Sequence, residues 1–188
     1  VAIQHALLYE ELQEKADILE ALHRAGQLVT SSLKREEILQ ATVLEAFKLT
    51  GVRGKKARFS SVALLDGRSL TFQAAYPAEF LPGLVERVNP IHLDGPGRIG
   101  LSGRAALSGL SERSGNVLKH PDYIGFDPQT RSELAVPIKV GSQIIGVINA
   151  EHPEVDVFSE EDRSALESLA TYTAIALQNA RTYEELVQ

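Results

Sequence analysis

Cysteine is absent from this 188-residue chain. Without a thiol the protein has no disulfide, no thiolate metal site, no cysteine nucleophile and no thioether-linked chromophore. The lack of cysteine fits a reducing compartment, and we expect the protein to be cytoplasmic. Methionine is absent as well, and the chain begins at Val1. Because natural proteins start with methionine, we expect the sequence to be a fragment of a longer protein.

Long apolar runs and an excess of positive charge are also missing. No apolar run approaches the ~20 residues that a helix needs to span a bilayer, and the start shows no signal-peptide pattern. The formal net charge is -6, so we expect neither a nucleic acid nor a membrane as partner. A local basic run opposes this average, and we interpret it as a solvated loop before a strand. It consists of Arg53, Lys55, Lys56 and Arg58.

Helical patterns occupy both ends of the chain. Hydrophobic residues make up 44% of the sequence, which suffices for the core of one domain of this length. Apolar residues at helical spacing, without proline, predict helices over 6–28 and 35–49. Ser159 followed by Asp162 is typical of a capping box, so we expect a last helix over 159–188.

Two hairpins are the clearest strand patterns. The first runs over 59–76 and turns at Asp66-Gly67, a strong two-residue turn. The second runs over 134–150 with alternating apolar residues and turns at Gly141-Ser142. Pro137 cannot donate a ladder hydrogen bond, so its strand must lie at an edge or be bulged there.

The segment between the hairpins is mixed. It predicts a short helix over 78–88 broken at Pro82-Gly83, a strand over 89–93, a helix over 99–107 and a loop over 116–131. Hairpins dominate and no clear βαβ unit is present. We therefore predict an α+β fold with one antiparallel sheet of five to six strands, helices on both faces and long helices at both termini.

The first and last segments of the chain resemble each other. Residues 2–12 match residues 176–186 at seven of eleven positions, at a constant offset of 174. One interpretation is a complete domain cycle in a tandem array, and the alternative is coincidence between two amphipathic, Glu-rich helices. The first interpretation divides the chain into a signalling helix over 1–29, a domain over 30–176 and an extension toward an output domain over 177–188.

A heptad-like seam follows the last helix. Its centre is small and weakly apolar, which would let a second helix approach closely. Two interpretations stand: the seam packs only on the domain's own sheet, or both terminal helices join a parallel homodimer. The seam consists of Leu166, Leu169, Thr173, Ala176, Ala180, Tyr183 and Val187.

Several motifs in order resemble those of GAF domains. They are Thr-Arg-Ser-Glu-Leu-Ala-Val-Pro-Ile over 130–138, Ile-Gly-Val-Ile-Asn-Ala-Glu over 145–151 with Phe-Ser-Glu-Glu-Asp over 158–162, Gly-Leu-Ser-Gly-Arg-Ala over 100–105, and His-Pro-Asp-Tyr over 120–123. The resemblance covers about residues 30–180. It implies a six-stranded antiparallel sheet with a ligand pocket on one face and dimerising helices on the other. It also implies a place upstream of a histidine kinase, diguanylate cyclase or transcriptional output domain.

The departures from the family narrow its possible chemistry. Phytochrome-type members attach bilin through cysteine, and this chain has none. The Asn-Lys-x-Phe-x-x-x-Asp-Glu pattern of members that bind cyclic nucleotides is absent. Free methionine sulfoxide reductases share the fold but use cysteine, so we expect no such activity and no catalysis.

Loops and glycine-rich segments predict a pocket under residues 98–132. Gly95 to Gly100 lacks the Lys-Ser/Thr of a phosphate loop, and no histidine pair has metal-ligand spacing, so we expect no metal. Arg131 could clamp an anion or make a local salt bridge. The sequence names neither a ligand nor a cofactor. The polar candidates for ligand binding are His92, Arg98, Ser102, His120, Tyr123 and Arg131.

Three functions remain open at this point. The leading hypothesis is a non-catalytic sensory domain that binds a small ligand or relays a signal through its terminal helices to a covalently linked output domain. The second is a structural dimerisation spacer without a ligand. The third is a hydrolase or reductase on the same fold, against which the lack of cysteine and of any acid–base cluster argues.

Overall fold

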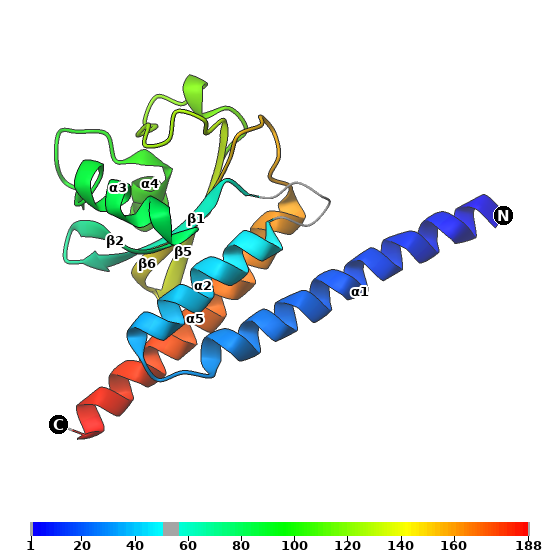
Figure 1. Cartoon of the computed structure of the whole chain (residues 1–188), viewed down its shortest axis with the longest axis horizontal. Helices are drawn as coiled ribbons and strands as arrows, with labels where there is room; N and C mark the ends of the chain where they lie inside the picture. The colour runs from blue at the N-terminus through cyan, green and yellow to red at the C-terminus, as the bar shows by residue number, and fades with distance from the viewer. Residues whose placement is uncertain (1, 51–56, 188) are drawn as a thin grey trace.

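Two hairpins build the centre of the sheet in the computed structural model, which describes residues 2–50 and 57–187 (Figure 1). The first joins β1 (Phe59–Asp66) to β2 (Ser69–Tyr76), and the second joins β5 (Ser132–Val140) to β6 (Gln143–His152). Gly67 and Gly141 have φ of 56° and 61°, the left-handed conformation that these tight turns require. Strands β1 and β6 pair antiparallel and join the hairpins into one sheet.

Two short strands complete the six-stranded sheet, whose order is β3-β2-β1-β6-β5-β4 with every pair antiparallel. They are β3 (Ile91–His92) and β4 (Glu112–Ser114). The α+β fold with five to six antiparallel strands is thereby confirmed. Along β5, pairing with β4 ends at Ala135, and a register shift follows Ile138. Pro137 therefore lies at a stretch of open edge next to a bulge, as its missing N–H predicted.

Three helices lie on one side of the sheet (Figure 1). Helices α2 (Arg35–Leu49) and α5 (Glu160–Val187) cover the face, and α1 (Ala2–Thr30) packs on them through its C-terminal part. A Cβ atom on Gly26 would lie 2.8 Å from the Tyr172 ring, so α1 and α5 approach too closely there for a side chain. The N-terminal half of α1 leaves the body and is exposed to solvent.

The seam of the last helix packs largely within its own chain. Ala176 and Ala180 are buried in the same apolar cluster as Ala25 and Val29 of α1. These two alanines are therefore not available to a second copy, which corrects the idea that the centre of the seam forms a dimer interface. Only its distal end, with Tyr183, is exposed.

The other face of the sheet carries α3 (Leu81–Arg87), α4 (Gly100–Ser108) and the 3₁₀ turn η1 (Ala78–Phe80), and a second 3₁₀ turn, η2 (Val117–Lys119), lies in the loop between β4 and β5. The helix break expected at Pro82-Gly83 does not occur. Pro82 instead lies in the first turn of α3, where its missing N–H leaves no hydrogen bond unmade. No helix among residues 2–50 and 57–187 combines the length and the apolar character needed to cross a membrane. The first three residues of the basic run lie outside the described residues.

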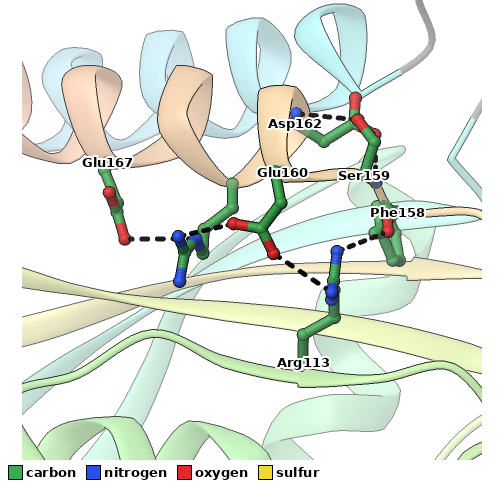
Figure 2. Close-up of polar contacts among 7 residues, drawn as sticks. Arg113, Phe158, Ser159, Glu160, Asp162 and Glu167 are labelled. Carbon is green, nitrogen blue, oxygen red and sulfur yellow. Dashed lines mark hydrogen bonds and ion pairs between the residues drawn. The ribbon is translucent and has the colours of Figure 1, made fainter.

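A reciprocal cap begins α5 (Figure 2). The N–H of Ser159 donates to Asp162 Oδ2 at 2.7 Å, and the N–H of Asp162 donates to Ser159 Oγ at 3.2 Å. Each side chain thus satisfies a backbone donor at the helix start that has no partner inside the helix. The capping box read from the sequence is confirmed.

This cap gives a direct stability prediction. We expect Ser159→Ala to lower the free energy of unfolding by about 1 kcal/mol, because it removes one half of the cap. Urea unfolding measures the change. Ser164→Ala, at an exposed position in the same helix, is the control and should change stability little. Equal effects of the two substitutions would contradict the role given to the cap.

Candidate functional site

A cavity of about 20 Å³ lies between the sheet and the layer that holds α3 and α4. That volume admits roughly one water molecule. Its walls are mostly apolar, but three polar side chains of the sheet and one of α4 line it. The lining residues are Phe72, Leu84, Val88, Ile91, Gly100, Leu101, Ser102, Ile124, Phe126, Glu133, Asn149 and Glu151.

Two glutamates form the floor of this cavity. Glu133 on β5 and Glu151 on β6 are direct cross-strand partners, and each is only 5% exposed. Directly opposed residues on one face of an antiparallel pair have Cβ atoms about 4.5–5.5 Å apart, so two ionised carboxylates here repel each other. Thr130 Oγ1 donates to Glu151 Oε2 at 2.6 Å, and Asn149 Nδ2 donates to Glu151 Oε1 at 3.2 Å.

Burial changes the protonation of this pair. Desolvation, with the charge of Glu151 as a smaller cause, holds the pKa of Glu133 well above its usual range. Desolvation also raises the pKa of Glu151 to about 7, although the hydrogen bonds from Thr130 and Asn149 oppose the rise. The floor of the cavity therefore retains a proton near neutral pH.

The surrounding charges among residues 2–50 and 57–187 do not neutralise the pair. Arg58 is committed to Asp127, with 2.7 Å between Nε and Oδ2. His152 follows Glu151 on the strand but faces the opposite side of the sheet, where it contacts the Phe158 ring at 6.5 Å between centroids. Burial also raises the pKa of the Tyr123 hydroxyl, so this side chain stays neutral.

Unpartnered polar atoms surround the same floor. Ser102 Oγ and Asn149 Oδ1 have no hydrogen-bond partner, and their residues are 4% and 3% exposed. Ser61, the cross-strand neighbour of Asn149 on β1, is fully buried and its Oγ is unpartnered too. Buried polar atoms without partners are rare because each costs about 1–3 kcal/mol. Their concentration here makes this cavity the candidate site.

The loop between β4 and β5 covers the cavity. Ile124 and Phe126 of this loop line it. Arg98 Nη1 donates to the backbone oxygen of Tyr123 at 3.3 Å, and Arg104 Nη1 donates to Asp122 Oδ2 at 3.1 Å. Polar contacts between α4, its preceding loop and this covering loop therefore hold the cavity closed.

The cavity lies partly under residues 98–132, where a pocket was predicted, but the candidate residues are placed differently around it. Ser102 lines it directly, and Tyr123 is half-buried in the covering loop. Arg98 is exposed and fixes that loop from outside.

The remaining three candidates lie away from the cavity lining. His92 is exposed on β3, with its ring Nδ1 3.1 Å from Ser69 Oγ. His120 Nδ1 accepts a hydrogen bond from the Asp122 N–H. Arg131 Nη1 donates to the backbone oxygens of Pro128 and Thr130, so its local contacts are hydrogen bonds to the backbone and not the predicted salt bridge.

The three polar residues of the floor were missed as site residues, although they belong to the quoted motifs. The sequence did contain a usable pattern. Leu134 and Ala150 turn toward the helices, so the residues one position away, Glu133, Asn149 and Glu151, must turn to the other face. These three residues could have been identified from the sequence, because a charged or amide side chain is unusual inside a strand that is buried on both faces.

Comparison with known proteins places the chain in a family. The model for the GAF domain matches residues 32–178. The chain belongs to the GAF domain family. The motif resemblance is thereby confirmed.

Among curated proteins, the GAF chain is 34% identical over 71 residues to Protein YtsP of Bacillus subtilis (strain 168), a match that covers 38% of this chain and 44% of that protein. The matched segment thus spans less than half of this relative.

Solved structures share the same fold. The GAF domain of an Acinetobacter phosphoenolpyruvate-protein phosphotransferase has a TM-score of 0.72 at 22% identity, over 87% of this chain and 94% of that one. The free methionine-R-sulfoxide reductase of Neisseria meningitidis, solved with its substrate, has a TM-score of 0.73 at 22% identity, over 88% and 91%. At such identities the likeness shows the fold alone, and that fold occurs both as a domain of a phosphotransferase and as a reductase.

The glutamate pair makes stability depend on pH. Because both pKa values are raised above the usual 4.5, the folded chain holds protons that the unfolded chain has released. Stability should therefore fall as the pH rises from about 4.5 through the folded-state values. Glu133→Gln should raise the free energy of unfolding at about pH 8 by about 1 kcal/mol or more, since one pKa unit corresponds to about 1.4 kcal/mol, and change it little at about pH 4.

Denaturant titrations of the wild type and the variant at the two pH values measure this effect. Glu45→Gln is the matched control, because Glu45 is also 5% exposed but lies on α2, beyond the opposite face of the sheet, and pairs with Lys48. A Glu133→Gln variant that is less stable than the wild type at the higher pH would refute the assignment of a strained carboxyl pair.

Proposed function

We propose that the chain is a non-catalytic sensory domain, in which a small molecule in the cavity biases the packing of the terminal helices. One observation carries the proposal: the strands that form the floor of the cavity also form the support of α5. On β5, Glu133 faces the cavity while Leu134 packs in the cluster that contains Leu166 of α5. A ligand that moves the floor therefore acts on the backbone that α5 rests on.

The edge strand β4 supplies a second connection. Glu112 lies on the side of α4, with its Oε2 3.4 Å from Arg104 Nε. The next residue, Arg113, turns to the other side, where Nη2 is 3.1 Å from Glu160 Oε1 and Nη1 donates to the Phe158 oxygen at 3.0 Å (Figure 2). Since Arg104 also holds the covering loop, these contacts connect the loop over the cavity to the first turn of α5.

The alternative functions have weaker support. A spacer without a ligand gives no reason for unpartnered Ser102 and Asn149 atoms beside a buried glutamate pair. The reductase of Neisseria meningitidis acts on free methionine sulfoxide, but this chain has no cysteine to supply a thiol. We propose binding without turnover, in a cytoplasmic signalling protein whose output domain is a histidine kinase or a diguanylate cyclase.

Spin labels on the terminal helices test the relay. The chain has no cysteine, so Glu20→Cys and Tyr183→Cys place unique labels on the exposed parts of α1 and α5, away from the exposed leucines of α1. A size-fractionated bacterial metabolite extract that raises the melting temperature should also change the distance between the labels. Arg113→Ala should keep the rise in melting temperature and reduce the distance change.

Arg181→Ala is the control for this experiment, since it breaks an exposed ion pair within α5, to Glu185, that has no link to the cavity. It should leave both responses intact. If no fraction raises the melting temperature, the spacer function is favoured. If a fraction binds but the label distance stays fixed, binding without relay is the result.

We also propose that two copies of the chain associate through the protruding half of α1. Leu8, Leu12 and Leu19 are exposed there, and their spacing of four and seven continues into Leu22, which packs on the body. This row follows the a and d positions of a heptad repeat. The row can pack against the same row of a second copy, because a parallel pair of helices places each leucine beside its equivalent.

Sedimentation tests the association. The wild type should be dimeric at tens of micromolar, and the double variant Leu12→Glu with Leu19→Glu should be monomeric, because it would bury like charges against each other. Ala6→Glu, at an exposed position off the leucine row, is the control and should remain dimeric. A monomeric wild type at that concentration would exclude association through α1 alone.

A further inference from the structure

We propose that the ligand of the cavity carries a primary ammonium group, which Glu133 and Glu151 bind between them, and an apolar remainder that contacts the opposite wall. This inference rests on the proposed function in that the cavity must bind a small molecule. It adds the chemical class of that molecule: an aliphatic amine or a free amino acid rather than an anion such as a nucleotide.

The charge of the site selects a cation. Glu133 and Glu151 face each other on the floor, and no lysine, arginine or histidine is among the described residues that line the cavity. Arg58, which precedes β1, already pairs with Asp127. A buried carboxylate pair without a counter-ion is costly, and a bound cation removes that cost. An anionic ligand would add a third negative charge.

The hydrogen-bonding capacity of the site fits an ammonium group. Such a group has three N–H donors and no acceptor. The floor offers it the two carboxyl groups and Asn149 Oδ1, an acceptor that has no partner and belongs to a residue 97% buried. Ser102 Oγ, equally unpartnered, lies on the α4 side of the cavity, where it can bond a second polar group of the ligand.

The walls select an organic cation over a bare metal ion. Leu84, Leu101, Ile124 and Phe126 surround the polar floor, and apolar walls offer no ligands for a metal that takes six or more oxygens. No group of three metal-binding side chains occurs among residues 2–50 and 57–187. An aliphatic chain attached to the ammonium group would bury its surface against these residues.

The covering loop must move to admit such a ligand. The cavity of about 20 Å³ has space for roughly one water molecule, and an amino acid is several times larger. Tyr123 and Asp122 are held by one hydrogen bond each to Arg98 and Arg104, and both arginines are exposed. Opening therefore breaks these two exposed polar contacts and lifts Ile124 and Phe126 from the cavity, which separates the Phe126 ring from the Phe59 and Phe80 rings.

Binding should also release a proton. A cation between the two glutamates favours their ionised forms, which burial disfavours in the free protein. The affinity for an ammonium ligand should therefore rise between about pH 6 and pH 8. The other titratable groups around the pair are Asp127, which pairs with Arg58, and Tyr123, whose hydroxyl stays neutral because burial raises its pKa.

The test uses the 188-residue chain and defined probes. The twenty L-amino acids and n-pentylamine are titrated singly by calorimetry, each against its N-acetyl derivative, with 1-pentanol and pentanoate as uncharged and anionic counterparts of the amine. We expect at least one ammonium compound to bind with a millimolar or lower Kd at about pH 8, at least tenfold more tightly than its counterparts. Calorimetry in buffers of different ionisation enthalpy should detect the released proton.

Variants separate recognition from stability. Glu133→Gln and Glu151→Gln should each weaken binding of that compound at least tenfold and reduce the proton release, while the free variants stay folded because a strained charge is removed. Glu45→Gln, at an equally buried glutamate away from the cavity, should bind as the wild type does. Unchanged binding in both pocket variants would overturn the proposal.

Other outcomes are equally decisive. Failure of every ammonium probe, or tighter binding of a 3′,5′-cyclic nucleotide, pentanoate, Mg²⁺ or Ca²⁺ than of any ammonium probe, would also overturn it. If an extract fraction binds and moves the labelled helices while all ammonium probes fail, the sensory function stands and the ligand class is wrong. If an ammonium probe binds through Glu133 and the helices stay fixed, the ligand class stands and the relay is wrong.

Discussion

Burial on both faces of β5 and β6 is the constraint on which the rest of the molecule depends. Successive side chains of a strand point to opposite faces, so each of these strands must serve a helical layer and a cavity at once. Leu134 and Ile148 pack under α2 and α5, while Glu133 and Asn149 face α4. A one-residue slip of register would place the carboxyl groups in the apolar core of the helices, so the pairing that forms the site is also the pairing that the core enforces.

The carboxyl pair itself works against the stability of the fold. Natural cores seldom hold two opposed acids with unpartnered neighbours, because each such group costs free energy that packing must offset. The large apolar clusters on both faces of the sheet supply the stabilising free energy that offsets this cost. A region that lowers stability and is closed by a few exposed arginine contacts is typical of a ligand site rather than of a structural element.

Much of the fold could be predicted from local chemistry, and much of the site could not. Asp66-Gly67 and the Ser159–Asp162 cap each act within a few residues, so the sequence reveals them directly. Strand β4 has three residues, too few for an alternation pattern, and was missed. Ala176 and Ala180 suit a close helix contact of either kind, so the sequence could not decide between α1 of the same chain and a second copy. Glu133 and Glu151 are 18 positions apart, and only the hairpin register brings them together.

The contact between Gly26 and Tyr172 has a mechanical consequence. It fixes the distance between α1 and α5 at one point near the base of α1, because no side chain separates the helix backbone from the ring. From that fulcrum the helix extends 24 residues to Ala2, or about 36 Å at ~1.5 Å per residue. A tilt of about 5° at the fulcrum would move the far end by about 3 Å. The glycine thus makes α1 a lever arm, in which a change too small to disturb the core becomes a displacement as wide as a side-chain contact.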